Sequence, residues 1–185
     1  MANHDVLTYQ EAITALGGEG PSPMLVESWV SAISLKLDEE YGPVVQRSVT
    51  DTFDGGGWYV VLSETPVSVV SAVTESSVAL TASDYVVYPE TGILRRRRGT
   101  TDCRWKTDRL NITVTYTAGR FASVAAVDDG FKRGAGIILR HLHTADYGSG
   151  GELFNGEGFP SGFAIPNRAF EVIGFPRRRK LPLVG

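Results

Sequence analysis

Two runs of basic side chains could bind a negatively charged partner. The first precedes Gly99, and the second, Arg177–Lys180, stands between Pro176 and Pro182. Guanidinium groups bind phosphates and carboxylates through paired N–H donors, so DNA and an acidic protein surface are both candidate partners of each run. On a strand, successive side chains alternate between faces, which favours a solvated hairpin end or an acidic contact over DNA for the first run. The first run comprises Arg95, Arg96, Arg97 and Arg98.

The histidines and the cysteine lack the spacing that metal or nucleophile chemistry needs. His141 and His143 are two residues apart, which on a helix places them on roughly opposite faces, whereas a shared metal prefers a spacing of four. The single cysteine, Cys103, has no base that the sequence pairs with it. We therefore expect packing or solvent-facing histidines and no metal, cofactor or catalytic residue.

The glycine-rich turn Asp54–Gly57 does not predict an enzyme either. A phosphate-binding loop continues into lysine and serine or threonine, but here Trp58 and Tyr59 follow the glycines. Asp84 and Glu90 lie in predicted turns with no histidine at plausible range. The sequence thus predicts a protein that is not an enzyme.

The composition suits a chain that buries one core, with room for a small second lobe. Of the 185 residues, 42% are hydrophobic, and a formal net charge of −3 gives no general reason to expect nucleic acid or an anionic membrane as partner. No apolar stretch approaches the ~20 residues of a membrane helix, and the polar N-terminus lacks the layout of a signal peptide. We expect a soluble protein made in the cytoplasm, with no membrane partner.

Residues 1–43 predict two helices. Thr8 and Glu11 have the spacing of a capping box. Ser22 and Pro23 begin a second helix, in which apolar residues recur every three or four positions. This stripe consists of Val26, Trp29, Val30, Ile33, Leu37 and Tyr41.

Residues 44–119 change to a period of two, which is typical of strands. The alternating residues 46–53 and 58–62 flank the turn at 54–57 and predict a hairpin. About six short strands at this spacing predict a small antiparallel sandwich or barrel-like sheet.

Residues 120–148 predict a third helix, with Asp128 and Asp129 at its positive end. Gly130, Gly134 and Gly136 crowd its first two turns, at a cost of about 1 kcal/mol each relative to alanine. We expect another backbone to approach closely there, either the second helix or a neighbouring subunit. The residues predicted to pack between helices or subunits are Trp29, Ile33, Leu37, Gly130, Gly134 and Ile138.

The closing segment, residues 149–185, scatters phenylalanines among glycine, proline and arginine without a period. Its aromatic content is too high for a solvated linker, and aperiodic segments of this length either are disordered or dock on something. We interpret it as an extended arm that docks on a partner and can be deleted without loss of the fold. The predicted docking residues are Phe154, Phe159, Phe163, Phe170, Phe175, Arg177, Arg178, Arg179 and Lys180.

These elements predict an α+β chain: a helical body of about three helices, an inserted antiparallel β domain and an extended C-terminal arm. Over residues 8–147 their order and spacing resemble the head–tail connector (adaptor, or head-completion) proteins of long-tailed bacteriophages and related gene-transfer particles. The resemblance is carried by the segments LDEEYG at 37–42, LSETPVSVVSAV at 62–73, DYVVY at 84–88, TGIL at 91–94 and ITVTYTAG at 112–119.

The resemblance implies a structural virion protein in the neck at the capsid vertex, made in the host cytoplasm. It implies a ring of copies, commonly twelve, beneath the portal protein. Such a ring would extend the DNA channel, contact DNA transiently and give tail-side neck or stopper proteins a platform. The helices would form the ring wall, and the C-terminal arm is a candidate for the portal contact.

Two alternatives stay open. The first is another neck component, such as a stopper or tail-completion protein, which we expect to be dominated by a β-barrel; the strong helical pattern at 22–41 argues against it. The second is a DNA-binding accessory factor that uses the arginine runs, which predicts salt-sensitive DNA binding by the isolated protein.

Overall fold

The computed structural model describes residues 4–18, 20–147 and 165–177. They fall into two compact units: a helical unit within Met1–Val44 and Ser123–Gly185, and a β unit, Val45–Ala122, that holds all the described strands. Helices and antiparallel sheets therefore occur in one chain, and the predicted α+β class is confirmed. Within the described ranges, no helix has the length and apolar character needed to span a membrane.

The first two helices begin at the predicted caps. In front of α1 (Tyr9–Leu16), Thr8 Oγ1 accepts a hydrogen bond from Glu11 N at 3.3 Å, and Glu11 Oε2 accepts one from Thr8 N at 2.8 Å. Helix α2 (Pro23–Tyr41) has proline in its first turn, and its predicted apolar stripe is buried throughout. Both helices therefore follow from local sequence signals.

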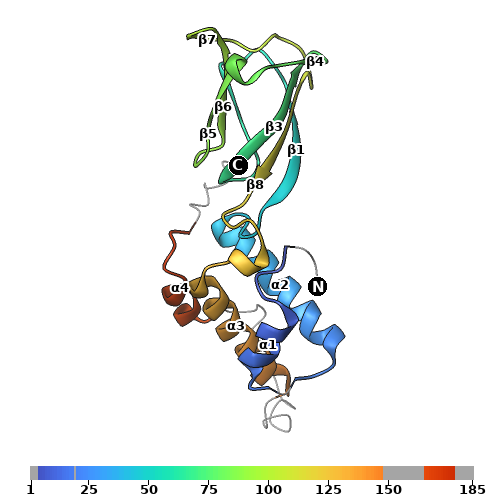
Figure 1. The fold of residues 1–185 in the computed structure, drawn as a ribbon, viewed down its shortest axis with the longest axis vertical. Helices are drawn as coiled ribbons and strands as arrows, with labels where there is room; N and C mark the ends of the chain where they lie inside the picture. The colour runs from blue at the N-terminus through green and yellow to red at the C-terminus, as the bar shows by residue number, and fades with distance from the viewer. Residues whose placement is uncertain (1–3, 19, 148–164, 178–185) are drawn as a thin grey trace, which may run out of the picture. The chain divides into compact units, whose positions relative to one another are not determined.

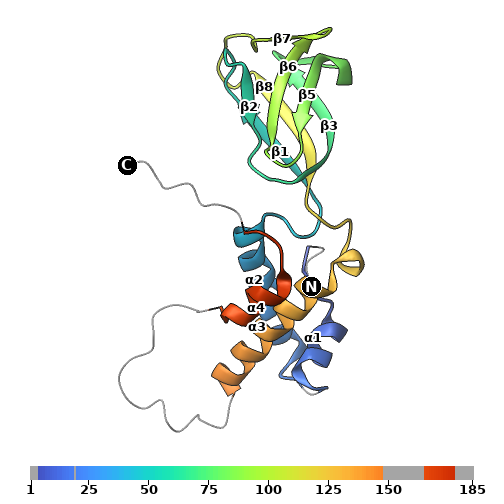
Figure 2. The ribbon, with the colours of Figure 1, turned by 90° about the vertical axis from the view of Figure 1, so that its left-hand side faces the viewer.

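Helix α3 (Asp129–Tyr147) is the centre of the helical unit and contacts α1, α2 and α4. It lies between α1 and α4 in both views (Figures 1 and 2). Of the two predicted caps, Asp128 accepts a hydrogen bond from Gly130 N through Oδ1 at 2.7 Å. The buried stripe of α3 includes Phe131, Ala135, Ile138 and Leu139.

A fourth helix, α4 (Asn167–Ile173), lies in the segment that the sequence predicted to be an extended arm. For these residues the prediction of a segment without elements of its own is wrong. Seven residues are too few to display a helical period, and a helix this short is stabilised by tertiary packing rather than by intrinsic propensity. Ala169 and Ile173 are buried, and Gly174 ends the helix with a φ of 68°.

The β unit contains two antiparallel sheets around a shared apolar core. One sheet has the strand order β1-β8-β3-β4, and the other has the order β2-β6-β5 with β7 paired to β6; β4 is labelled in Figure 1 and β2 in Figure 2. Trp105, Leu94 of the second sheet and Val114 of the first are buried in one cluster, as expected of the predicted sandwich. The strands are β1 Arg47–Phe53, β2 Tyr59–Val61, β3 Val67–Glu75, β4 Val78–Ala79, β5 Tyr85–Tyr88, β6 Ile93–Arg98, β7 Thr101–Cys103 and β8 Ile112–Ala118, and short 3-10 turns occupy Ala82–Asp84 and Val124–Ala126.

Strands β1 and β2 do not form the predicted hairpin, because they belong to different sheets. β1 pairs with β8 along its whole length, and β2 pairs with β6. The glycine turn between them packs on a distant loop: Gly55 N donates a hydrogen bond to Asp108 O at 2.8 Å. A Cβ on Gly55 would lie 1.8 Å from Lys106 O. The glycines therefore permit close backbone approach, and the turn carries the chain from one sheet to the other.

Candidate functional site

Gly130 and Gly134 form the face of α3 on which α4 lies. A Cβ on Gly134 would lie 2.6 Å from Ile173 Cγ1 and 3.0 Å from Ala169 O. A Cβ on Gly130 would lie 3.0 Å from Val172 O. The predicted close approach therefore exists, but the backbone at these two glycines is that of α4 in the same chain, rather than the second helix or a neighbouring subunit.

The described docking residues of the C-terminal segment contact their own chain. The ring centroids of Phe170 and Tyr41 are 6.4 Å apart, and those of Phe175 and Phe131 are 5.1 Å apart. The Arg177 guanidinium lies 3.5 Å from the centroid of the Phe170 ring. These contacts hold the segment on α2 and α3. The other docking residues lie outside the described residues, and their role stays a prediction: Phe154, Phe159, Phe163, Arg178, Arg179 and Lys180.

The packing residues predicted on α2 and α3 lie in the core of the helical unit. Trp29, Ile33, Leu37 and Ile138 are all buried. Trp29 also makes an edge-on contact with His143, with ring centroids 6.1 Å apart. No group of three or more His, Cys, Asp or Glu side chains that could hold a metal ion occurs in the described part of the chain.

Arg96 joins the two sheets of the β unit. Its Nε lies 3.2 Å from Oε2 of Glu75, at the end of β3, whereas Arg96 itself is on β6. The Glu75 side chain is 4% exposed, and its other oxygen accepts a hydrogen bond from Lys106 N at 2.8 Å. This arginine is therefore part of the internal structure of the unit.

The other arginines of the run alternate in direction, as strand geometry requires. Arg95 and Arg97 each lie 3.3 Å from a carboxylate oxygen of Asp102. Arg95 also lies over the ring of Tyr88, at 5.6 Å from its centroid. Arg98 is exposed, and it alone of the four has no ion pair with a described residue. Three arginines of the run thus form ion pairs within the β unit, with Arg95 and Arg97 sharing one carboxylate, which weakens the prediction that the run contacts DNA.

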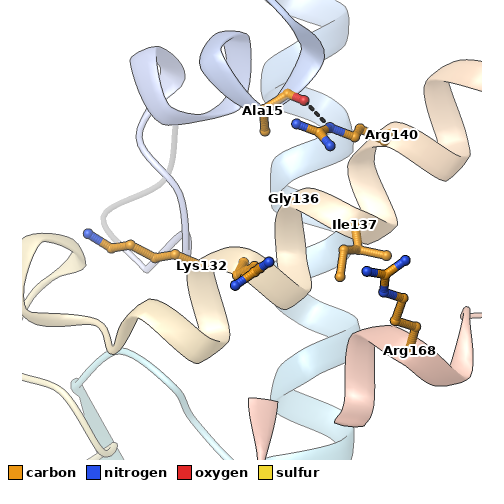
Figure 3. A pocket seen from close by; sticks show the side chains of 7 residues that line it. Ala15, Lys132, Gly136, Ile137, Arg140 and Arg168 are labelled. Carbon is orange, nitrogen blue, oxygen red and sulfur yellow. Dashed lines mark hydrogen bonds between the residues drawn. The ribbon is translucent and has the colours of Figure 1, made fainter. Parts of the chain in front are cut away.

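A cleft of about 480 Å³ opens in the helical unit where α1, α3 and α4 meet (Figure 3). We call it the arginine cleft, because three arginines and a lysine lie around an apolar floor. Its lining consists of Lys132, Arg133, Gly136, Ile137 and Arg140 of α3, Arg168 of α4 and Ala15 of α1.

Two of these cations have partners within the chain. Arg140 Nε donates a hydrogen bond to the carbonyl oxygen of Ala15, in the last turn of α1, where carbonyl groups lack helical partners. Lys132 Nζ lies 2.7 Å from Glu11 Oε1. Burial acts to raise the pKa of Glu11, but its bonds with Lys132 and Thr8 outweigh this effect and lower the pKa. The Lys132 charge is therefore balanced locally.

Arg133 and Arg168 have no such partner among the described residues. Both side chains are exposed, and neither makes an ion pair or hydrogen bond with the part of the chain that the structure describes. The sequence indicates part of this cleft, because Arg133 and Arg140 are seven residues apart and lie on one helix face. It does not indicate the contribution of Arg168, because α4 was not predicted.

No known protein-family model matches this sequence, and no curated protein matches it. The fold is similar to chains in solved particles of a gene transfer agent (GTA). One, in the virion of a native GTA particle, has a TM-score of 0.63 at 14% identity, covering 96% of this chain and 92% of that chain. Another, in the neck of an empty GTA particle computed with C6 symmetry, has a TM-score of 0.63 at 15% identity, with the same coverage.

A third similar chain is in the neck of a native GTA particle computed with C12 symmetry. It has a TM-score of 0.56 at 13% identity, and 98% of each chain is covered. At these identities the comparison establishes a shared fold that extends over nearly the whole chain.

Proposed function

We propose that this chain is a structural protein in the neck of a phage-like virion, a head–tail connector (adaptor) whose copies form a ring. The observation that carries the proposal is the fold similarity over 96–98% of the chain to components of GTA virions and necks. Both the helical unit and the β unit fall within that coverage. One fold can serve several functions, so assembly is the property that must be tested.

In the finer form of the proposal, about twelve copies bind beneath the portal protein. The ring extends the DNA channel, and tail-side neck or stopper proteins bind to it. The C12 symmetry of one similar neck supports this copy number. Physically, a head-to-tail contact repeated by rotation closes into a ring when the angle between copies permits it.

The outer face of the second sheet supports a role in assembly. Tyr59 and Val61 on β2 and Tyr88 on β5 are 54%, 51% and 45% exposed. The strand register places these side chains together, because Val61 and Tyr88 both pair with Ile93, and Tyr59 pairs with Arg95. Aromatic and arginine side chains are enriched among the residues that dominate protein–protein binding. We assign this face to contact with another neck protein.

The portal contact stays with residues 149–164 and 178–185 in this proposal. The reason is that Phe170, Phe175 and Arg177 already pack on their own chain. The basic tail residues and the three remaining phenylalanines are then the side chains available to bind the portal.

The test is reconstitution with the portal protein of the same particle. Twelve copies of a 20.0 kDa chain have a mass of about 240 kDa, which mass photometry can distinguish from the monomer. We expect electron microscopy of the mixture to show an additional ring on one face of the portal. A chain that stays monomeric beside intact portal rings, and is missing from purified virions, would overturn the proposal.

A further inference from the structure

We propose that the arginine cleft is a binding site for a carboxylate-bearing segment of a partner protein. The cleft combines exposed guanidinium groups from two helices with an apolar floor. Arg133 and Arg168 make no ion pair with described residues, so their charges are available for a ligand. A guanidinium matches a carboxylate with two parallel N–H donors, and such charge-assisted bonds are stronger than neutral ones.

The side chains are arranged for an incoming ligand. The bond from Arg140 Nε to Ala15 O fixes this guanidinium at one wall and leaves its terminal nitrogens for other acceptors. Figure 3 shows Arg168 extending from α4 toward Ile137 of α3, while Lys132 points away from Arg140 and Arg168. A group held in place before binding loses less conformational entropy on binding, which favours affinity.

The shape and charge of the cleft favour a protein ligand over DNA. A DNA duplex carries one charge per ~1.7 Å of its axis and is bound by cations spread along a surface. Here three arginines and a lysine line one hollow, whose floor of Ala15, Gly136 and Ile137 suits the methylene groups of an acidic side chain.

The test uses the full chain and three probes: a hexaglutamate peptide with blocked ends, a short DNA duplex and inorganic phosphate. Titration calorimetry measures binding, and the arginine Nε–Hε signals in NMR spectra locate it. We expect the peptide to shift the signals of Arg133 and Arg168. We also expect Arg168→Gln and Arg133→Gln each to weaken peptide binding roughly tenfold.

Arg98→Gln is the matched control, since it removes one exposed arginine from the β unit and should leave peptide binding unchanged. Arg168→Lys keeps the charge but loses the planar pair of donors, so it should bind with intermediate strength. Equal melting temperatures of all variants exclude an effect through folding.

Three results would overturn the proposal. The first is that the wild-type chain does not bind the peptide. The second is that Arg98→Gln and Arg168→Gln lose peptide affinity equally. The third is that the duplex binds more tightly than the peptide and that its binding depends on Arg168 in the same way. The last result would make the cleft a phosphate site for nucleic acid.

Discussion

Gly134 and Ile173 are packed so closely that no side chain fits between them. A Cβ on Gly134 would lie 2.6 Å from Cγ1 and 2.8 Å from Cδ1 of Ile173. The main-chain oxygen of Ala169 would be 3.0 Å away, so rotation of the isoleucine side chain alone does not make room. This contact compensates for a glycine in the interior of α3, and it ties the last described helix to the central one.

Gly134→Ala should therefore destabilise the protein. Alanine gains about 1 kcal/mol in helix propensity, but overpacking of a tight contact costs about 1–3 kcal/mol. The backbone oxygen at 3.0 Å limits relaxation, so we expect a net loss in the free energy of unfolding. A larger loss is expected for Gly134→Leu. Urea denaturation measures both.

A double mutant separates this contact from a general effect on the helix. Ile173→Ala alone should cost about 2–5 kcal/mol, because Ile173 is buried. In that background Gly134→Ala should cost less than in the wild type, since the shortened side chain leaves space. Additive effects of the two substitutions would contradict the packing argument.

The sequence predicted those elements whose signals are local. The capping pair Thr8 and Glu11 and the stripe of α2 lie within a few residues of the helices that they specify. Helix α4 was missed because its stability depends on the glycine face of α3. The available hint was the spacing of four residues between Gly130 and Gly134, which marks one helix face.

Strand pairing was predicted less well than strand existence. A period of two identifies a strand but does not name its neighbour, and β1 pairs with β8, about sixty residues later in the chain. The ion pairs of the arginine run depend on such contacts, because Glu75 reaches Arg96 across the two sheets. The arginine cleft was not predicted for the same reason: one of its walls is α4.

Arg96→Ala should strongly destabilise the β unit. The substitution leaves Glu75 buried without its cation, and breaking such a pair typically costs about 3–5 kcal/mol. Arg98→Ala should change stability by no more than about 0.5 kcal/mol, because Arg98 is exposed. Chemical denaturation of the two variants provides the comparison. Similar stabilities would show that the Arg96–Glu75 pair is unimportant.

The free energy of unfolding should fall above pH 10 because of Tyr116. Burial raises the pKa of Tyr116, and its hydrogen bond to Asp51 at 2.8 Å raises it further. The unfolded chain releases this proton near the ordinary value of about 10, whereas the folded chain retains it. The stabilisation is therefore fully present below pH 10 and is lost as the pH rises through the folded pKa.

Tyr116→Phe should make this alkaline loss shallower, even though the variant is less stable at neutral pH. Tyr59→Phe is the control, because Tyr59 is largely exposed. Urea denaturation between pH 8 and 11 measures the slope. The prediction would be contradicted if plots of the free energy of unfolding against pH remained parallel for the wild type and Tyr116→Phe across this range.

The packing of α4 reverses our expectation from the sequence that residues 149–185 can be deleted without loss of the fold. A chain of residues 1–147 lacks α4 and the side chains that cover Phe131 and Tyr41, both of which are buried. Re-exposing a large apolar side chain costs about 1.5–3 kcal/mol. We expect a clearly lower melting temperature for residues 1–147, whereas residues 1–177 should melt close to the full chain.

The same two truncations separate folding from attachment. If the basic tail at 178–185 binds the portal, a chain of residues 1–177 should fold normally and retain the contacts of Phe170 and Arg177. It should nevertheless bind portal rings more weakly than the full chain does. Replacing Arg178, Arg179 and Lys180 with glutamine in the full chain should reproduce the weaker binding, and rising salt should reduce the difference. Cosedimentation with portal rings at two salt concentrations measures this. Binding of residues 1–177 at full strength would remove the tail from the portal contact and leave residues 149–164 as the remaining candidate.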